Sequence, residues 1–581
     1  MANLSKIKRD DLIDRIEALK TQYKDDEDTK LLLNTVINEL TGKKYGLIWE
    51  QHEENVDKKM ETAIPVFDEI KEREICGNPD DEKINFLLEG DNLHSLKLLE
   101  KTHKGKIDVI YIDPPYNTEN KDFIYEDRIV GKDDGYRHSK WLSFMNERLK
   151  IAKKLLSQQG VIFISIDDNE YSQLKILCDS IFNEENFVVN IIWAKNSGNN
   201  NSVNVSIKTE YVLVYGNDKK HLGKSFFSQR KESFDDILAL VKKCKDNGMT
   251  PEEAQAELKN YYLKNKNIPD GTKQYKYVDD EFRIFRISDL GNSSDTAYQK
   301  PEYTYDYINP LTGEKCEIPK RGWLYKKKDL DKKVAENIIY FKAKVPQLKR
   351  YLDSVEYENV SSLLINNDLG NRDLEGVING KSSFSYPKPI SLIKKCISCN
   401  SNKDITVLDF FAGSGTTGQA VMDLNMEDGG SRKFILCTNN ENNICEDVTY
   451  QRLKTVITGI RKDGSKYSDG ISANLKYYKT DFVSKISKDE DYYIEDKITQ
   501  HIKEMIELEN AVEIDNDKYV LLLTDEEVDA FEQDMKNKNL KKVYIDSTIM
   551  LSGKALSYLD DKKVEVIPIP DSYFYKDINA G

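Results

Sequence analysis

Four consecutive residues, Asp113, Pro114, Pro115 and Tyr116, carry the groups needed to act on an aromatic amine. The exocyclic N6 amine of adenine is a poor nucleophile, because its lone pair is delocalised into the ring. The Asp113 carboxylate and the Pro114 carbonyl would accept hydrogen bonds from its two N–H groups and so free that lone pair. Two successive prolines fix φ and keep the carbonyl oriented, and the Tyr116 ring offers a surface on which an extruded base can stack. The alternative is a strand-ending turn capped by Asp113.

A second cluster, DFFAGSGTT at residues 409–417, places a glycine turn between a predicted buried strand and a predicted helix. Gly413 and Gly415 permit a tight turn and a close approach of the backbone to a ligand. The first N–H groups of the following helix have no partner within the helix, so they would bind a carboxylate or another anion. The alternative is a turn that serves only the packing of strand against helix.

An acidic residue, Glu441, follows the next predicted strand, 26 residues beyond Gly415. A carboxylate at about that distance from a glycine turn commonly binds ribose hydroxyls. The alternative for Glu441 is an exposed carboxylate in a loop. Because all three features follow predicted strands, we expect them to meet at the carboxyl edge of one sheet, where open α/β sheets bind ligands.

The elements that position these residues alternate between strand and helix. Near-continuous apolar runs predict buried strands, typical of a parallel sheet, at 84–91, 106–113, 160–167, 405–411 and 433–440. Further strands are predicted at 186–193 and 210–216. Helical periodicity predicts helices at 92–101, 141–157, 171–182, 390–397, 416–424 and 446–460. This alternation is typical of an α/β fold with crossover helices.

The remaining ranges differ from this core in composition. Residues 216–375 are polar and rich in Tyr and Lys, and they interrupt the α/β pattern, so we interpret them as an inserted domain between core halves at 61–215 and 376–475. Within it, residues 320–350 hold eleven Lys or Arg against three Asp or Glu. A solvated helical face is the alternative to a phosphate-binding surface. A helical region is predicted at 1–60 and a smaller α+β domain at 476–581.

The composition is that of a globular protein, with 39% hydrophobic and 32% charged residues and a net charge of −15. No apolar run reaches transmembrane length and no secretory signal opens the sequence, so we expect a cytoplasmic protein with no membrane contact. Eight cysteines include one CxxC pair, Cys396 and Cys399, which without a second pair is weak evidence for zinc. We therefore expect reduced thiols and no metal site.

Two motifs carry a resemblance to a known family. DPPYNT at 113–118 followed by FAGSGTT at 411–417 resembles the β-class amino-methyltransferases of DNA, in which the catalytic motif precedes the cofactor motif and a target recognition domain lies between them. LEGDNLHSLKLL, GVIFISIDDNE, FSYPKP and TNNENNICEDVTYQRLK are similar to the modification subunit of type III restriction-modification systems. The resemblance covers roughly 80–215 and 380–480 and is weak elsewhere.

The resemblance implies a Rossmann-like sheet with permuted motif order that transfers a methyl group from S-adenosylmethionine to adenine N6 in duplex DNA. Asp rather than Ser or Asn before Pro-Pro-Tyr favours adenine over cytosine in this family. Catalysis is then assigned to the four residues 113–116. The cofactor-binding residues that the resemblance implies are Asp91, Phe384, Pro387, Lys388, Pro389, Asp409, Phe411, Gly413, Ser414, Gly415, Thr416, Thr417 and Glu441.

The implied partners are double-stranded DNA, a second copy of the chain as a homodimer, and a restriction subunit carrying helicase and nuclease activities. An orphan methyltransferase without a restriction partner is one alternative. A second alternative is an enzyme acting on RNA bases or protein glutamine, although the long insert disfavours a small substrate. A third, from another class, is a DNA-specificity module with idle chemistry, which the intact motifs oppose.

Overall fold

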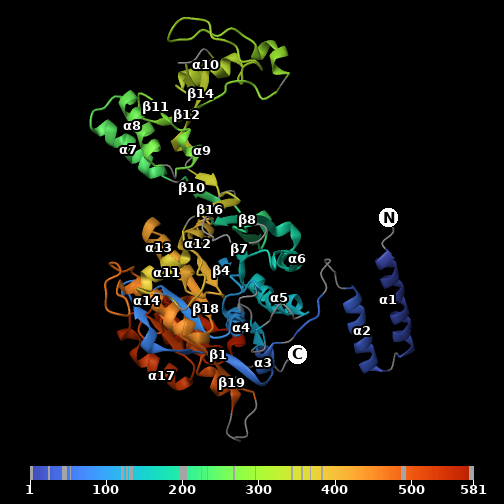
Figure 1. Cartoon of the computed structure of the whole chain (residues 1–581). Coiled ribbons are helices and arrows are strands. Elements are labelled where there is room, and N and C mark those ends of the chain that lie inside the picture. Colours follow the sequence, from blue (N-terminus) through green and yellow to red (C-terminus); the bar gives the residue numbers. More distant parts are fainter. Residues whose placement is uncertain are drawn as a thin grey trace. The chain divides into compact units, whose positions relative to one another are not determined.

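The computed structural model describes residues 4–574 except for 24–25, 42–48, 53, 119–123, 126–127, 130–134, 196–205, 224–225, 232, 266–267, 295, 342–344, 355–356, 367, 381, 383 and 486–492. The chain divides into two compact units. Unit 1 comprises Met1–Gly223, Ser361–Ser398 and Asn402–Gly581, and unit 2 comprises Lys224–Val360 with Cys399–Ser401. Figure 1 shows both units in the colours of the sequence.

Unit 1 is built on one large mixed sheet, in which the strands follow the order β1-β19-β3-β18-β17-β4-β7-β9-β8-β16, with β2 paired to β19. Its strands are β1 (Ala63–Glu69), β2 (Ile75–Cys76), β3 (Ile84–Glu89), β4 (Ile107–Ile112), β7 (Leu156–Ile166), β8 (Phe187–Lys195), β9 (Thr209–Gly216), β16 (Leu363–Asn366), β17 (Thr406–Asp409), β18 (Lys433–Thr438) and β19 (Asn474–Ser484). A separate hairpin pairs β5 (Ile124–Tyr125) with β6 (Arg128–Ile129).

The centre of the sheet is parallel, which confirms the α/β fold predicted from the apolar runs. Strands β19, β3, β18, β17, β4 and β7 all run in one direction, whereas β9 is antiparallel to β7 and to β8. After β17 the chain moves to β18 on one side, and after β4 it moves to β7 on the other. The strand order therefore reverses between β17 and β4, and such a switch point is where open α/β sheets bind ligands.

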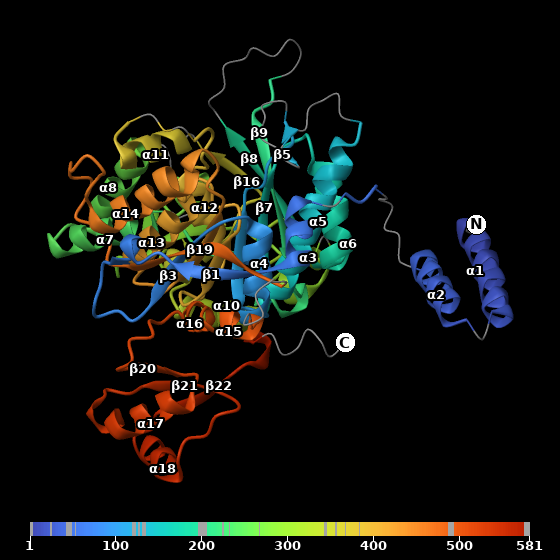
Figure 2. The ribbon, with the colours of Figure 1, turned by 90° about the horizontal axis from the view of Figure 1, so that it is seen from below.

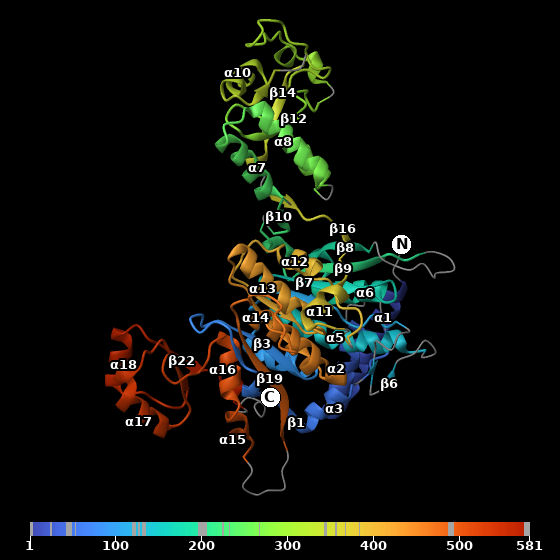
Figure 3. The ribbon, with the colours of Figure 1, turned by 60° about the vertical axis from the view of Figure 1, so that its left-hand side comes forward.

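Two helical layers contact the sheet of unit 1, as Figures 1 and 3 show. One layer holds α4 (Asn92–Thr102), α5 (Arg137–Leu155), α6 (Tyr171–Phe182) and α16 (Ile502–Asn510). The other holds α11 (Gly370–Ile378), α12 (Ile390–Ile397), α13 (Thr416–Asp428) and α14 (Tyr450–Thr458). The range predicted as one helix at 446–460 instead begins with a π-helical turn at Ile444–Thr449 that leads into α14.

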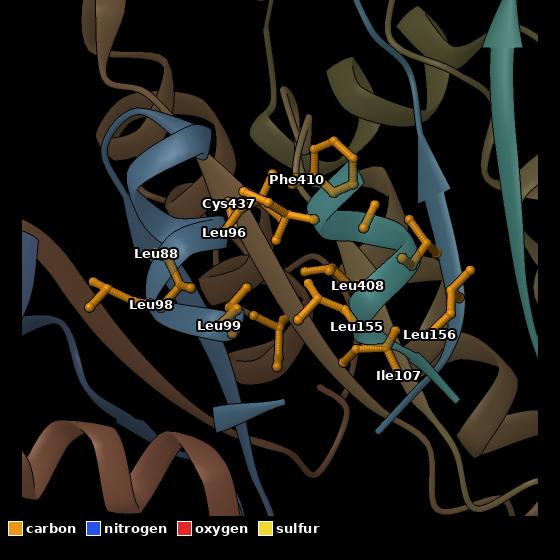
Figure 4. Close-up of a cluster of buried hydrophobic side chains, with 14 of the residues drawn as sticks. Leu88, Leu96, Leu98, Leu99, Ile107, Leu155, Leu156, Leu408, Phe410 and Cys437 are labelled. Atoms are coloured by element: carbon orange, nitrogen blue, oxygen red, sulfur yellow. The ribbon is translucent and has the colours of Figure 1, made fainter. Parts of the chain in front are cut away.

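The main core lies between the first helical layer and the sheet. Figure 4 shows Leu96 and Leu99 from α4, Leu155 from α5, and Leu408 and Phe410 from the β17 region gathered in this core. All five side chains are completely buried. Burying an apolar side chain of this size stabilises the fold by roughly 1.5–3 kcal/mol, so this core fixes the strands whose ends carry the predicted site.

Both ends of the chain add helices to unit 1. The N-terminal helices are α1 (Leu4–Gln22), α2 (Glu27–Thr41) and α3 (Asn55–Thr62). At the other end, α15 (Ile494–Thr499) precedes a small sheet of β20 (Tyr519–Leu522), β21 (Lys542–Asp546) and β22 (Glu565–Ile569), alternating with α17 (Asp525–Asp534) and α18 (Gly553–Asp561), as Figure 2 shows. These three strands are parallel, so this part consists of β-α-β units rather than of separate helices and strands. In the part of the chain that the structure describes, no helix is long and apolar enough to cross a bilayer.

Apart from Cys399–Ser401, unit 2 lies within the range 216–375 predicted for the insert. Its elements are β10 (Ser228–Arg230), α7 (Phe234–Asp246), α8 (Pro251–Lys264), α9 (Asp270–Lys273), β11 (Tyr277–Val278), β12 (Ile284–Ser288), α10 (Lys327–Ala335), β13 (Ile339–Tyr340), β14 (Gln347–Tyr351) and β15 (Tyr357–Asn359). Helix α8 begins with a capping box between Thr250 and Glu253. Residues 361–375, also expected in the insert, belong to unit 1, because β16 pairs in parallel with β8.

Candidate active site

The sheet brings the predicted site residues to one edge. Asp113 follows β4, the glycine turn follows β17, Glu441 follows β18 and Asp91 follows β3. These four strands are adjacent and parallel, so their carboxyl ends meet at the same edge. The pairing of Leu408 with Ile110 sets the glycine turn directly beside the residues that follow β4.

Asp113 is held in an ion pair with a lysine from a distant part of the sequence. The Lys388 Nζ lies 2.8 Å from one Asp113 carboxylate oxygen and 2.9 Å from the other. The Lys388 side chain is only 9% exposed, and its Nζ also lies 4.7 Å from the centre of the Tyr116 ring. Burial alone would lower the pKa of Lys388, but the carboxylates of Asp113 and Glu210 outweigh it and raise that pKa. Lys388 therefore stays charged beside Asp113.

Glu210, at the start of β9, is a second carboxylate in this site. One of its carboxylate oxygens lies 3.5 Å from the Lys388 Nζ and accepts a hydrogen bond from the Tyr116 hydroxyl at 3.3 Å. The other oxygen accepts a hydrogen bond from Lys195, at the end of β8. Burial would raise the pKa of Glu210, but Lys388 and Lys195 lower it below its ordinary value. Burial, with help from Asp113 and Glu210, raises the pKa of Tyr116 far above its ordinary value, so the phenol stays protonated.

Residues 113–116 form a turn after β4, which we call the catalytic turn. Its two proline carbonyls differ in their hydrogen-bond partners. The Pro115 carbonyl accepts a hydrogen bond from the Trp141 indole at 2.7 Å. The Pro114 carbonyl accepts none from any residue that the structure describes. Since Trp141 is fully buried in α5, its bond fixes the peptide that follows Pro115. The turn thus presents the Asp113 carboxylate together with an unused carbonyl, which is the acceptor pair that the sequence predicted for an amine.

The glycine turn is shaped to receive a ligand through its backbone. Gly413 and Gly415 have φ angles of 48° and 75°, in the left-handed region that favours glycine. A Cβ atom added at Gly413 would lie 2.7 Å from the ring of Phe384, so this ring lies directly over the turn. The main-chain N–H groups of Gly413 and Ser414 donate to no acceptor within the described ranges. They precede α13, whose N-terminus favours a negatively charged group.

Several side chains predicted to bind the cofactor point into the protein instead. The buried Asp409 carboxylate accepts hydrogen bonds from the Phe411 N–H at 3.0 Å and the Thr417 hydroxyl at 2.5 Å. The Ser414 and Thr416 hydroxyls are 3.0 Å apart, and both accept hydrogen bonds from the guanidinium of buried Arg452. These four side chains therefore hold the shape of the turn, which leaves its backbone to contact a ligand. The pattern DFFAGSGTT does not distinguish these two roles.

Asp91 and Glu441 occupy the far side of the same edge. Asp91 is the N-cap of α4, where its carboxylate accepts a hydrogen bond from the Leu93 N–H at 2.8 Å. The same carboxylate lies 3.5 Å from the guanidinium of buried Arg148. Glu441 begins a 3-10 turn at Glu441–Asn443 and is exposed. Its carboxylate is available to a ligand at the end of β18.

One short segment joins the two motifs. Phe384 covers the glycine turn and Lys388, four residues later, binds Asp113. Four residues of extended chain span at most about 14 Å. The catalytic turn and the glycine turn are therefore close enough for a ligand at one turn to lie next to a ligand at the other. Pro387, Lys388 and Pro389 in this segment are buried. Lys388, expected to bind the cofactor, contacts the predicted catalytic residues Asp113 and Tyr116.

Three contributors to this site were not singled out from the sequence. Glu210 and Lys195 come from adjacent antiparallel strands, and Trp141 comes from α5. The only available signal for Glu210 was a charged residue that opens an otherwise apolar strand. Such residues are common at strand ends, so only the pairing of β7 with β9 distinguishes this one.

The sequence that builds this fold matches a known protein family. Residues 107–449, more than half of the chain, match the family described as DNA methylase, and the chain belongs to this family. The chain is 32% identical to the type III restriction-modification enzyme StyLTI Mod subunit of Salmonella typhimurium, over 68% of this chain and 60% of that subunit. It is 31% identical to the type II methyltransferase M.KpnI of Klebsiella pneumoniae, over 70% of this chain and 93% of that enzyme.

Solved structures give a more distant likeness. The structure of the PvuII DNA methyltransferase (cytosine-N4-specific) aligns with a TM-score of 0.29 and 12% identity, over 61% of this chain and 83% of that chain.

Proposed function

We propose that this protein transfers a methyl group from S-adenosylmethionine to the N6 amine of adenine in duplex DNA. The observation that carries the proposal is the acceptor pair of the Asp113 carboxylate and the unused Pro114 carbonyl, beside a glycine turn with unused N–H groups. The turn suits the methionine carboxylate of the cofactor, because two N–H groups precede a helix N-terminus there. The exposed carboxylate of Glu441 suits its ribose hydroxyls.

The chain's own residues then prepare the amine. S-adenosylmethionine, when bound, supplies a methyl group already activated by the positive sulfur. The Asp113 carboxylate and the Pro114 carbonyl accept hydrogen bonds from the two N6–H groups, while the Tyr116 ring stacks on the extruded base. A carboxylate has about four acceptor positions, so Asp113 can hold the amine without releasing Lys388. Orientation of this kind can lower a barrier by about 7–11 kcal/mol in well-aligned cases.

The electron and proton balance needs no further reactant. The N6 lone pair forms the new N–C bond as the bond between carbon and sulfur breaks, and N6 gains a positive charge. One N6 proton then leaves, and the nearest acceptors are the Asp113 carboxylate and solvent. Lys388 keeps the Asp113 carboxylate paired with a cation throughout.

Unit 2 supplies the proposed contacts with DNA. It holds 26 Lys and Arg against 23 Asp and Glu, although the whole chain has a net charge of −15. On α10, the exposed Lys327, Lys328 and Lys332 form no ion pair with any residue in the described ranges. Exposed unpaired lysines are suited to phosphate contacts, which give affinity and salt dependence but no sequence specificity.

The proposal extends to the biological setting through the relatives. The chain spans only 60% of the length of the StyLTI subunit that it matches. We propose the same role, as the modification subunit of a type III system, acting as a homodimer with a separate restriction subunit. Purification of the chain together with a restriction subunit encoded beside it, and the mass of the complex, would test both partnerships.

The test of the activity is methyl transfer from labelled S-adenosylmethionine into duplex DNA, with identification of the modified nucleoside by mass spectrometry. We expect N6-methyladenine from the wild-type chain and none from the Asp113→Ala variant, which should still bind S-adenosylmethionine in calorimetry. Asp108→Asn, at the amino end of the same strand, is the matched control and should remain active. Recovery of N4-methylcytosine would refute the adenine assignment, and full activity of Asp113→Ala would refute the catalytic site.

A further inference from the structure

A further buried carboxylate, Glu170, is linked to the residue that follows the catalytic turn. It precedes α6 as its N-cap residue and its side chain is completely buried. One carboxylate oxygen, Oε1, accepts a hydrogen bond from the Asn117 Nδ2 at 2.5 Å and lies 2.6 Å from the His138 Nδ1. Asn117 directly follows Tyr116, and His138 is the second residue of α5. Glu170 thus joins the start of the segment 117–138 to its end.

Asn117 is held tightly in this arrangement. It is 2% exposed and has a φ of 57°, a left-handed conformation that costs energy for residues other than glycine. Its Nδ2 also lies 3.4 Å from the Arg137 carbonyl, at the first residue of α5. The hydrogen bonds of this one amide therefore fix the backbone that follows the catalytic turn.

Glu170 is a costly residue for a purely structural link. Its second carboxylate oxygen, Oε2, is buried and has no hydrogen-bond partner within the described ranges. A buried acceptor without a partner is destabilising, because it loses its hydrogen bonds to water on folding. Burial raises the pKa of Glu170, while Asn117, His138 and Arg137 oppose that shift. The charged and polar groups that act on it are Asn117, His138 and Arg137, while Gln173 from α6 contacts His138.

We infer that Glu170 is a positioning residue, which holds the catalytic turn in its active geometry through Asn117 and anchors it to α5 through His138. The inference rests on the proposed function and adds a residue that does not touch the substrate. Displacement of reacting groups by about 1 Å can cost about 100-fold in rate. Loosening this link should therefore lower kcat and leave cofactor binding intact.

Two variants remove the link from opposite ends. Asn117→Gly removes the amide and keeps the left-handed backbone, since glycine adopts it readily, and Glu170→Ala removes the acceptor. We expect each to lower kcat about 100-fold while the Kd for S-adenosylmethionine stays within about threefold. The double variant should lose no more than either single variant, because both act on one interaction. Glu170→Gln keeps an acceptor for Asn117 and should recover most of the activity.

Matched controls separate this role from general destabilisation. Asn183→Gly changes an exposed asparagine with a φ of 71°, and Asp179→Asn changes another buried carboxylate of α6. Neither should lower kcat. A loss of activity in Asp179→Asn as large as in Glu170→Ala would overturn the inference.

Hydrogen exchange tests the inference independently of catalysis. Asn117→Gly and Glu170→Ala should each speed amide exchange in peptides covering 113–118, and the control variants should not. Unchanged exchange there would overturn the positioning role even if the wild-type chain methylates DNA. If exchange is faster in the two variants but the wild-type chain methylates no DNA, the positioning role stands and only the proposed function is refuted.

Discussion

At the scale of single residues, the site depends on how charges are buried. Lys388 lies between Asp113 and Glu210, and its ammonium offsets the repulsion between these two carboxylates. Removing one member of such a buried group leaves an uncompensated charge and costs several kcal/mol. The Lys388 ammonium therefore serves both carboxylates next to the Tyr116 ring.

Asp409 leads to a prediction about pH and stability. Burial raises its pKa from the ordinary 3.8 to about 7. The unfolded chain loses this proton near pH 4 whereas the folded protein keeps it to about pH 7, so stability falls as the pH rises between these values. Asp409→Asn should lack this loss, which amounts to at most about 4 kcal/mol. Thermal unfolding of both proteins at about pH 5 and pH 8 checks it, and an equal change of Tm in the two would contradict the prediction.

At the scale of elements, the glycine turn and the segment over it act together. Because a Cβ at Gly413 would lie 2.7 Å from the Phe384 ring, Gly413→Ala must displace that ring. We expect the variant to bind S-adenosylmethionine at least about tenfold more weakly, a difference of about 1.4 kcal/mol, as measured by calorimetry. Adding Phe384→Ala should relieve the clash, although the ring's own contact would be lost.

A matched glycine separates this clash from backbone strain. Gly429 ends α13 with a φ of 65°, but a Cβ there would meet nothing within 4 Å. Gly429→Ala therefore carries a similar backbone cost without the steric conflict, and its cofactor affinity should match the wild type. Equal weakening in both variants would show that strain, rather than the position of Phe384, sets the affinity.

At the scale of the whole molecule, the proposed function divides between the two units. Unit 1 holds the predicted catalytic and cofactor residues, and unit 2 holds the whole basic run at 320–350. An acidic chain can bind DNA in this way, because phosphate contacts depend on local charge and net charge sets mainly the long-range field.

This division predicts the salt dependence of DNA binding. Replacing Lys327, Lys328 and Lys332 by Ala should reduce the slope of log affinity against log salt by about 0.9 for each lost contact, or about 2.7 in all. Replacing the exposed Lys536, Lys554 and Lys562 of the C-terminal β-α-β part is the control and should leave the slope unchanged. Fluorescence anisotropy of labelled duplex over a salt series measures both slopes. An unaltered slope in the α10 variant would remove that helix from the proposed DNA surface.

The local features of this protein follow from its sequence. Apolar runs predict the parallel strands, glycines mark the turn after β17, and Asp113-Pro114-Pro115-Tyr116 marks the acceptor pair, because strand burial, turn conformation and proline geometry are short-range properties. The family follows from the same motifs and is confirmed by the match over residues 107–449. Helix α5 differs from its prediction only at its ends, where residues 156–157 already belong to β7.

The tertiary structure alone decided which distant residues meet. The order of the strands brings residues 113 and 413 together, and it also brings Glu210 to the Lys388 that pairs with Asp113. Spacing along the chain carries no information about such pairs, since any charged residue at a strand end has the same local pattern. The inward orientation of Asp409, Ser414, Thr416 and Thr417 was likewise hidden, because it depends on how α13 packs against Arg452 of α14.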